Sequence, residues 1–219
     1  MARKRLRLAR CRTAQILSIA SILVRQTGAR MKNEAIKRLP AEQAQGLGFV
    51  PEVAAALDSN RVVSQVLQEQ ITALEKRLKE RVSLRPKYRL LNTMPGIGET
   101  LATTIMLETS SIHRSSRVGD FSLCCRCLDS LRESNGRKKC EGNIKYGNKY
   151  LAWAFVEAAN FALHYCPQAK SFYKRKKHKT YRGLAIKALV RKLAPALPHA
   201  AGAQALRCGS MFHLTFRPK

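Results

Sequence analysis

The sequence contains few acidic residues, and very few aspartates. Asp and Glu together number 14, against 41 Lys and Arg. The aspartates are Asp58, Asp120 and Asp129. Metal-dependent nucleases gather carboxylates around their ions, so this chain has little material for such a centre. The net charge of +27 points instead to a polyanionic partner, most simply nucleic acid.

Long apolar runs are missing as well. No continuous hydrophobic stretch of about 18 residues occurs, the length that a membrane span requires, so we predict no membrane partner. Hydrophobic residues still make up 45% of the 219 residues. A chain of this length and composition can bury a core, which favours a folded protein over wholesale disorder.

The seven cysteines form neither a disulfide framework nor a zinc framework. Their number is odd and no secretory signal precedes them, which predicts a reduced, cytoplasmic setting. Cys124, Cys125 and Cys127 lie close together in the sequence. The second Cys or His pair that a structural zinc site needs is lacking, so we interpret these cysteines as small packing residues and predict no metal ligand.

The positive charge is concentrated in two blocks. Residues 1–38 contain eleven basic side chains and one acidic one, and residues 137–182 contain twelve and two. One basic block is often only a solvated surface, but two uncompensated blocks favour a polyanion. Within the first block we expect a basic amphipathic helix over 6–26 that ends near Gly28. A transit peptide is the alternative for this segment.

A long helix with a regular apolar pattern follows. Its apolar positions recur every three or four residues: Val63, Leu67, Ile71, Leu74, Leu78 and Val82. This period is typical of a helix packed against another helix. We expect the helix to be capped by Asp58 or Ser59 and ended by Pro86. Two interpretations stay open, namely a helix on the core of its own domain and an arm that pairs two chains.

Residues 88–109 predict two helices joined by a tight turn. Pro95-Gly96-Ile97-Gly98 separates two apolar helical stretches, which is the sequence form of a helix-hairpin-helix unit. Glycine lets a backbone approach a phosphate closely, and the N–H groups that begin the second helix suit an anion. Gly96, Ile97 and Gly98 are therefore predicted backbone contacts to DNA, with a ligand-free helical hairpin as the alternative.

In two later segments, Lys and Arg residues follow a polar turn or a pair of aromatic residues. We expect 112–147 to be mostly loop, with a short helix near 121–128 and a polar turn at Ser134-Asn135-Gly136. The turn is followed by Arg137, Lys138, Lys139 and Lys145. Ser134 is either an ordinary turn residue or a nucleophile toward phosphate.

The second of these segments follows a predicted helix from Gly147 to about Tyr165 that Pro167 stops. Here Phe172 and Tyr173 precede Lys174, Arg175, Lys176 and Lys177. Aromatic residues beside cations suit a nucleic-acid backbone. A final helix is expected near 184–193.

The order and spacing of these motifs resemble a known family. The segments are TMPGIGETLATTIMLET, FSLCCRCLDSLRESNGRKKCEGNIKYGNKYLAWAFVEAANFA, CPQAKSFYKRKKHKT and AIKALVRKLA. They are similar to the C-terminal domain of bridge-RNA-guided insertion-sequence transposases, the insertion sequence 110/1111/116/902 group. Residues 10–85 are similar to the helical and coiled-coil linker that precedes that domain.

This resemblance implies a recombinase in two parts. An N-terminal RuvC-like domain holds Mg²⁺ through Asp and Glu, and the C-terminal domain supplies a serine that attacks a DNA phosphate. Ser134 falls on that serine. The acidic ligands cannot be placed here, and the sequence after Leu193 departs from the family. The resemblance therefore implies a truncated chain that is inactive alone, with Mg²⁺ expected only with the missing domain.

The implied partners are DNA, a guide RNA and, through the coiled coil, further copies of the chain. The implied setting is the bacterial cytoplasm, in association with the nucleoid. Whether the chain is itself an enzyme stays open. The alternative function is a non-catalytic helix-hairpin-helix DNA-binding or regulatory protein.

Together the motifs predict an all-α fold, in which a coiled-coil or helical arm precedes a small helical domain with a helix-hairpin-helix unit. The expected parts are a basic linker at 1–57, a coiled-coil helix at 58–85, a transposase domain at 86–194 and a divergent, disordered tail at 195–219.

Overall fold

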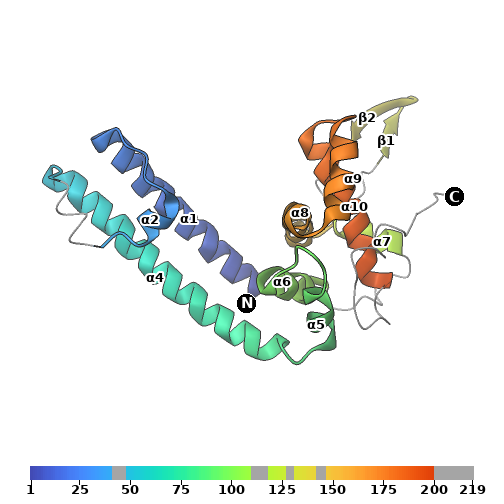
Figure 1. The fold of residues 1–219 in the computed structure, drawn as a ribbon, viewed down its shortest axis with the longest axis horizontal. Coiled ribbons are helices and arrows are strands. Elements are labelled where there is room, and N and C mark those ends of the chain that lie inside the picture. The colour runs from blue at the N-terminus through green and yellow to red at the C-terminus, as the bar shows by residue number, and fades with distance from the viewer. Residues whose placement is uncertain (41–47, 110–117, 127–130, 142–146, 200–219) are drawn as a thin grey trace. The chain divides into compact units, whose positions relative to one another are not determined.

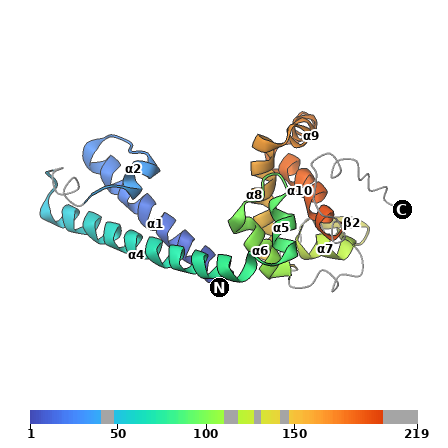
Figure 2. The same ribbon diagram turned by 60° about the horizontal axis from the view of Figure 1, so that its bottom comes forward.

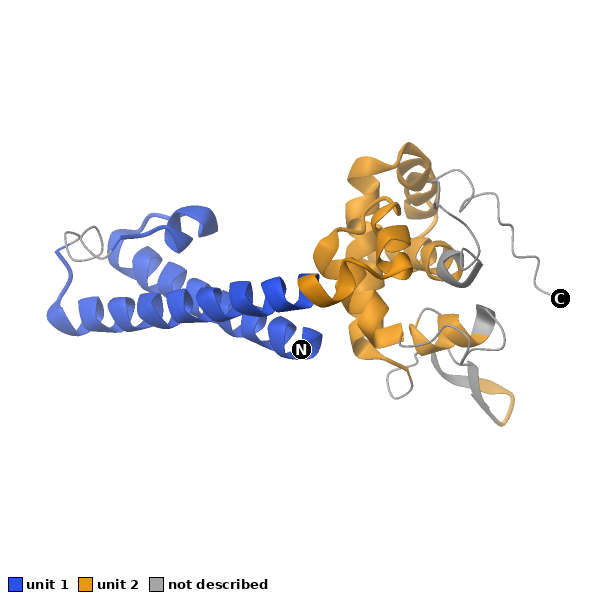
Figure 3. Cartoon of the chain, turned by 90° about the horizontal axis from the view of Figure 1, so that it is seen from below, with its two compact units in different colours: residues 1–79 blue, residues 80–219 orange. Residues whose placement is uncertain are grey.

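Helices form nearly all of the regular structure in the computed structural model (Figure 1). The structure describes residues 1–40, 48–109, 118–126, 131–141 and 147–199. Within these ranges one two-stranded hairpin is the exception to helix, and the predicted all-α class is confirmed. The chain divides into two compact units, residues 1–79 and 80–219 (Figure 3).

The first unit is built on two antiparallel helices. They are α1 (Ala2–Thr27) and α4 (Pro51–Val82), which lie side by side in Figures 1 and 2, with the short α2 (Asn33–Lys37) against α1. Near one end of the pair, Arg5 Nε donates to Glu75 Oε1 at 2.8 Å. Farther along, Asn60 Nδ2 donates to Ser18 Oγ at 3.3 Å. These two contacts fix the register between the helices.

A small apolar cluster holds the first unit together. Its buried members are Ile16, Ile19, Leu23, Ile36, Leu39 and Leu57. The expected amphipathic helix is confirmed, and it ends as predicted at Gly28, whose φ is +68°. Only glycine adopts this left-handed conformation readily, and the Gly28 N–H donates to Val24 O at 2.9 Å.

The long helix α4 differs from its prediction at both ends. It begins at Pro51, since proline is favoured in the first turn of a helix. The predicted cap at Asp58 or Ser59 is therefore wrong. Asp58 lies inside the helix, where it accepts a hydrogen bond from Arg61 Nε at 2.8 Å. The helix ends at Val82, and Pro86 begins the next helix instead of ending this one.

The second unit surrounds one apolar helix. It contains α5 (Pro86–Asn92), α6 (Glu99–Thr109), α7 (Val118–Cys124), α8 (Lys149–Tyr165), α9 (Pro167–Lys177) and α10 (Arg182–His199). Helix α8 packs against α6, α9 and α10, and α10 also contacts α7. Figure 2 shows α8 among these helices. Phe155 of α8 is fully buried and meets the ring of Phe121 edge-on at 6.2 Å.

Several expected elements of this unit are confirmed and others are corrected. The two helices around the Pro-Gly turn and the helix ending at Tyr165 are confirmed. The loop expected over 112–147 is wrong in part, because β1 (Leu131–Ser134) pairs with β2 (Arg137–Glu141). Pro167 begins α9, which the sequence did not predict. Helix α10 runs to His199, past Leu193, and residues 200–219 of the expected tail lie outside the described residues.

Candidate nucleic-acid interface

A tight turn joins α5 to α6. The Ile97 N–H donates to Met94 O at 3.1 Å, which closes a four-residue turn with Pro95 and Gly96 at its centre. Gly96 has a φ of +86°. Proline followed by a positive-φ glycine is typical of a type II turn. The sequence thus dictates this turn locally.

Gly96 makes its close approach to helix α8. A β-carbon at Gly96 would lie 2.4 Å from Ala158 O and 2.5 Å from Ala162 N. The first role of this glycine is therefore to let the turn pack against a buried stripe of alanines. Gly98 differs, because a β-carbon there would meet nothing within 4 Å. Of the predicted phosphate contacts, Gly98 is the one with open space around it.

Some backbone N–H groups of the turn are already hydrogen-bonded within it and cannot bind an anion. The Ile97 amide is used inside the turn, and the Ile97 side chain is buried. Helix α6 begins at Glu99, and its first i to i+4 bond runs from the Ala102 N–H to Gly98 O at 2.9 Å. The first N–H groups of a helix lack an intrahelical acceptor. The beginning of α6, after Ile97, is where an anion would be bound.

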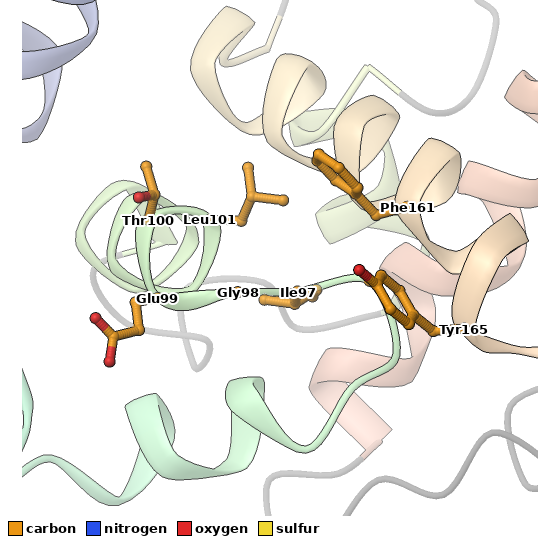
Figure 4. A pocket seen from close by; sticks show the side chains of 8 residues that line it. Ile97, Gly98, Glu99, Thr100, Leu101, Phe161 and Tyr165 are labelled. Atoms are coloured by element: carbon orange, nitrogen blue, oxygen red, sulfur yellow. The ribbon is translucent and has the colours of Figure 1, made fainter. Parts of the chain in front are cut away.

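A surface pocket of about 560 Å³ lies at this helix start. Its lining comes from the turn and α6 on one side and from Phe161 and Tyr165 of α8 on the other. Figure 4 shows the Tyr165 side chain directed from α8 toward Ile97 and the Phe161 ring directed toward Leu101. Sequence reasoning missed these two aromatic residues. The sequence could have indicated them, because two aromatic residues four positions apart lie on the same face of a helix.

Ser134 lies at the tip of the hairpin. It is the last residue of β1, and its α-carbon is paired with that of Arg137. Asn135 and Gly136 form the connection with φ values of +53° and +70°, typical of a two-residue type I′ turn. The predicted polar turn is confirmed. Arg137 is exposed, Lys138 and Lys139 follow on β2, and Lys145 lies outside the described residues.

The cations predicted after the aromatic pair all lie on α9. Ala169 is buried, Phe172 and Tyr173 pack against the core, and Lys174, Arg175, Lys176 and Lys177 are exposed. Lys176 Nζ lies 6.0 Å from the centre of the Phe172 ring. Cations in the last turn of a helix also stabilise it through the helix dipole. No acidic residue follows Glu157 in the sequence, so the positive field of α9 is uncompensated along the chain.

The Gly-Asn pair before α8 has a structural role. Gly147, with a φ of +88°, lies so close to α7 that a β-carbon would be 2.6 Å from Cys124 O. The Asn148 side chain accepts from the N–H groups of Tyr150 and Leu151 and donates to Glu108 Oε2 at 2.5 Å. One residue therefore caps α8 and ties its start to the end of α6.

The predicted packing role of the cysteine cluster is confirmed only at Cys125, which is buried in the core. Cys124 is exposed, and Cys127 lies outside the described residues. Among the described residues, no three His, Cys, Asp or Glu side chains come together where a metal ion could be held.

The pocket, the hairpin and the start of α9 lie within one recognisable stretch of sequence. Residues 88–174 match the model of the transposase IS116/IS110/IS902 family. No curated protein matches the chain. The second unit therefore contains a stretch that is similar to a domain of this transposase family. No helix among the described residues is long and apolar enough to cross a membrane.

Proposed function

We propose that the second unit binds DNA and serves insertion-sequence transposition, with Ser134 as the nucleophile toward a DNA phosphate. The observation that carries this proposal is the family match over 88–174. It includes the hairpin with Ser134, the turn before α6 and the beginning of the basic helix α9.

DNA backbone binding is assigned to the exposed cations of α9. Phosphate contacts from Lys and Arg supply most of the sequence-independent affinity for DNA. Four such side chains follow one another at the end of α9, with Lys170 one turn before them. Arg137 at the hairpin adds a cation beside the proposed nucleophile, and Lys138, Lys139 and Lys145 belong to the same proposal.

The chemical step assigned to Ser134 is a transesterification. The serine oxygen forms an ester bond to phosphorus while one bridging phosphorus–oxygen bond of the DNA breaks. The serine proton passes to a base, and the departing oxygen takes up a proton. Nearby cations stabilise the negative charge that develops on the phosphate oxygens.

This step needs groups that the described residues do not provide. The family resemblance implies Mg²⁺ held by carboxylates, but the described residues do not gather three side chains of that kind. The described residues therefore do not fit such a site. We propose that the described residues do not transfer strands alone and that the carboxylates are supplied from outside them. A guide RNA is a second proposed polyanionic partner.

Self-association is proposed through the outward side of α4. Ile71 and Leu78 are buried, whereas Val62, Val63 and Val66 are 43–50% exposed. The predicted apolar stripe therefore serves its own unit in part, as the first interpretation expected. Val63 of the predicted stripe thus lies with Val62 and Val66 in an exposed apolar strip on the same helix. We propose that a second copy of the chain covers it.

A non-catalytic DNA-binding protein is the second candidate function. The observation that favours it is the row of exposed cations on α9, because such cations bind phosphates without any reacting group. The experiment is to incubate the purified chain with duplex DNA, alone and with a full-length transposase of the family, and to assay native complexes and denaturation-resistant adducts. A native complex supports DNA binding. An adduct on this chain, formed only with the partner present, supports the serine mechanism. Lack of any native complex would refute both candidates.

A further inference from the structure

The pocket between α6 and α8 contains two large aromatic side chains that the fold does not bury. Phe161 is 46% exposed and Tyr165 is 73% exposed. They are four residues apart on α8 and therefore share one face of the helix. Ala158 and Ala162, which lie three residues before Phe161 and Tyr165, are fully buried. The alanines of α8 are thus in the core, whereas both rings stay exposed at the pocket.

The floor and wall opposite these rings are mostly apolar. Ile97 and Leu101 are buried in the core of the unit, and Gly98 has no side chain between the backbone and the pocket. The volume of about 560 Å³ lies within the usual range of ligand pockets, about 300–1,000 Å³. Glu99 is the acidic member of the lining, and Figure 4 shows its carboxylate directed away from the two rings.

The charge of the helix that follows α8 in the sequence indicates which kind of partner would offer flat apolar groups to these rings. Helix α9 begins two residues after Tyr165 and presents exposed cations from Lys170 onward. No acidic residue follows Glu157 in the sequence. The partner is therefore anionic, yet it must also supply planar apolar groups. Unpaired nucleotides have both properties, since phosphates favour cations and bases stack on aromatic rings.

We propose that Phe161 and Tyr165 form a stacking platform for unpaired bases of single-stranded DNA, and that the cations of α9 bind the phosphates beside them. The proposal rests on the proposed DNA function of this unit and adds the form of DNA that the pocket takes. Bases inside a duplex are stacked on one another, so the rings contribute to binding of a displaced or unpaired strand and not of a duplex.

The test compares two probes and matched variants. The chain is titrated with a fluorescent oligo(dT) strand and with a duplex of the same length at one salt concentration. The double variant Phe161→Leu with Tyr165→Leu keeps apolar bulk in the pocket and removes both rings. Tyr181→Ala is the matched control, because Tyr181 is also 69% exposed in this unit and does not line the pocket. Circular dichroism and thermal unfolding verify that each variant is folded.

The expected result is a loss of about tenfold or more in oligo(dT) affinity for the double variant, since base–aromatic stacking contributes on the order of 1–3 kcal/mol per base. Duplex affinity stays within about twofold of the wild type, and Tyr181→Ala changes neither. An oligonucleotide with abasic sites keeps the phosphates and lacks the bases. It should bind the wild type as weakly as oligo(dT) binds the double variant.

A second readout monitors stacking directly. Tyr165→Trp, in a chain with Trp153→Phe, places the single tryptophan on the platform. Oligo(dT) should quench its fluorescence at saturation, and the abasic strand should not.

Other outcomes overturn the proposal in distinguishable ways. Unchanged oligo(dT) affinity in the double variant, with duplex binding intact, would refute the platform and leave the proposed DNA function standing. Tighter binding of an oligo(U) RNA than of oligo(dT) would refute the assignment to DNA. If the wild type bound neither strand nor duplex, the proposed function itself would fail.

Discussion

The backbone of Gly96 packs directly against the Ala158 carbonyl of α8. A β-carbon at Gly96 would lie 2.4 Å from that oxygen, a separation that side-chain carbons do not tolerate. Gly98, two residues later, has open space instead. The two glycines of one motif therefore have different roles. Gly96 permits the packing of the second unit, and Gly98 leaves open space at the start of α6.

Replacing Gly96 tests the packing role. Gly96→Ala forces a side chain into a backbone with a φ of +86° and into contact with α8. Strain and overpacking each cost on the order of 1–3 kcal/mol, so the free energy of unfolding should fall by at least about 2 kcal/mol. Denaturant unfolding measures this change. A fall of less than about 0.5 kcal/mol would contradict the packing seen here.

Gly98→Ala is the matched substitution for the ligand role. Gly98 has no positive φ, and a β-carbon there would meet nothing within 4 Å. The stability loss should therefore stay near 1 kcal/mol or less, the range of a helix-cap change. If an anion approaches here, duplex affinity should fall several-fold in a folded variant. Equal affinity in Gly98→Ala and the wild type would exclude the turn from the DNA contact.

Ser134→Ala separates the catalytic candidate from the binding candidate. Because Ser134 lies at the tip of the hairpin, losing its hydroxyl should leave both the fold and native DNA binding unchanged. Any covalent adduct formed with a full-length transposase partner should disappear from this chain. Denaturing electrophoresis with labelled DNA gives the readout. An adduct that persists on the Ser134→Ala chain would assign the nucleophile to another residue.

The outer strip of α4 carries the prediction on self-association. Val62→Glu with Val66→Glu places charges on side chains that are 43% and 50% exposed. Thermal unfolding of the chain should change little, because exposed substitutions away from the core usually stay within about 0.5 kcal/mol each. Light scattering should give the mass of an oligomer for the wild type and a mass close to that of a monomer for the double variant. A wild type that is already monomeric at micromolar concentration would contradict the strip's proposed role.

Local chemistry makes parts of this fold predictable. The stop of α1 at Gly28 and the start of α8 at Asn148 both follow from backbone and cap preferences. The hairpin is predictable in principle as well, since Asn-Gly between two short strands is a strong hairpin signal. The segment is polar and rich in cations, which is typical of a loop, so its composition did not predict the strands. Pro167 is compatible with a helix stop, but proline suits the first turn of α9 equally well.

Other features depend on contacts between distant segments. Nothing near Gly96 in the sequence indicates that its neighbour is Ala158, since the two are brought together only by the packing of the turn on α8. The same is true of the pocket, in which Gly98 faces Phe161 and Tyr165. The cations of α9 are predictable as a group from composition alone, but their helix is not. Composition indicates the partner's charge, and tertiary packing determines the site.

The salt dependence of duplex binding tests the central claim most directly. Affinity is measured from about 50 to 200 mM salt for the wild type and for a variant with Lys174, Arg175, Lys176 and Lys177 all changed to Gln. The wild type should weaken steeply, and the slope of log affinity against log salt should decrease by roughly one for each phosphate contact removed. A wild-type affinity that is flat with salt, or an identical slope in the variant, would contradict DNA binding through α9.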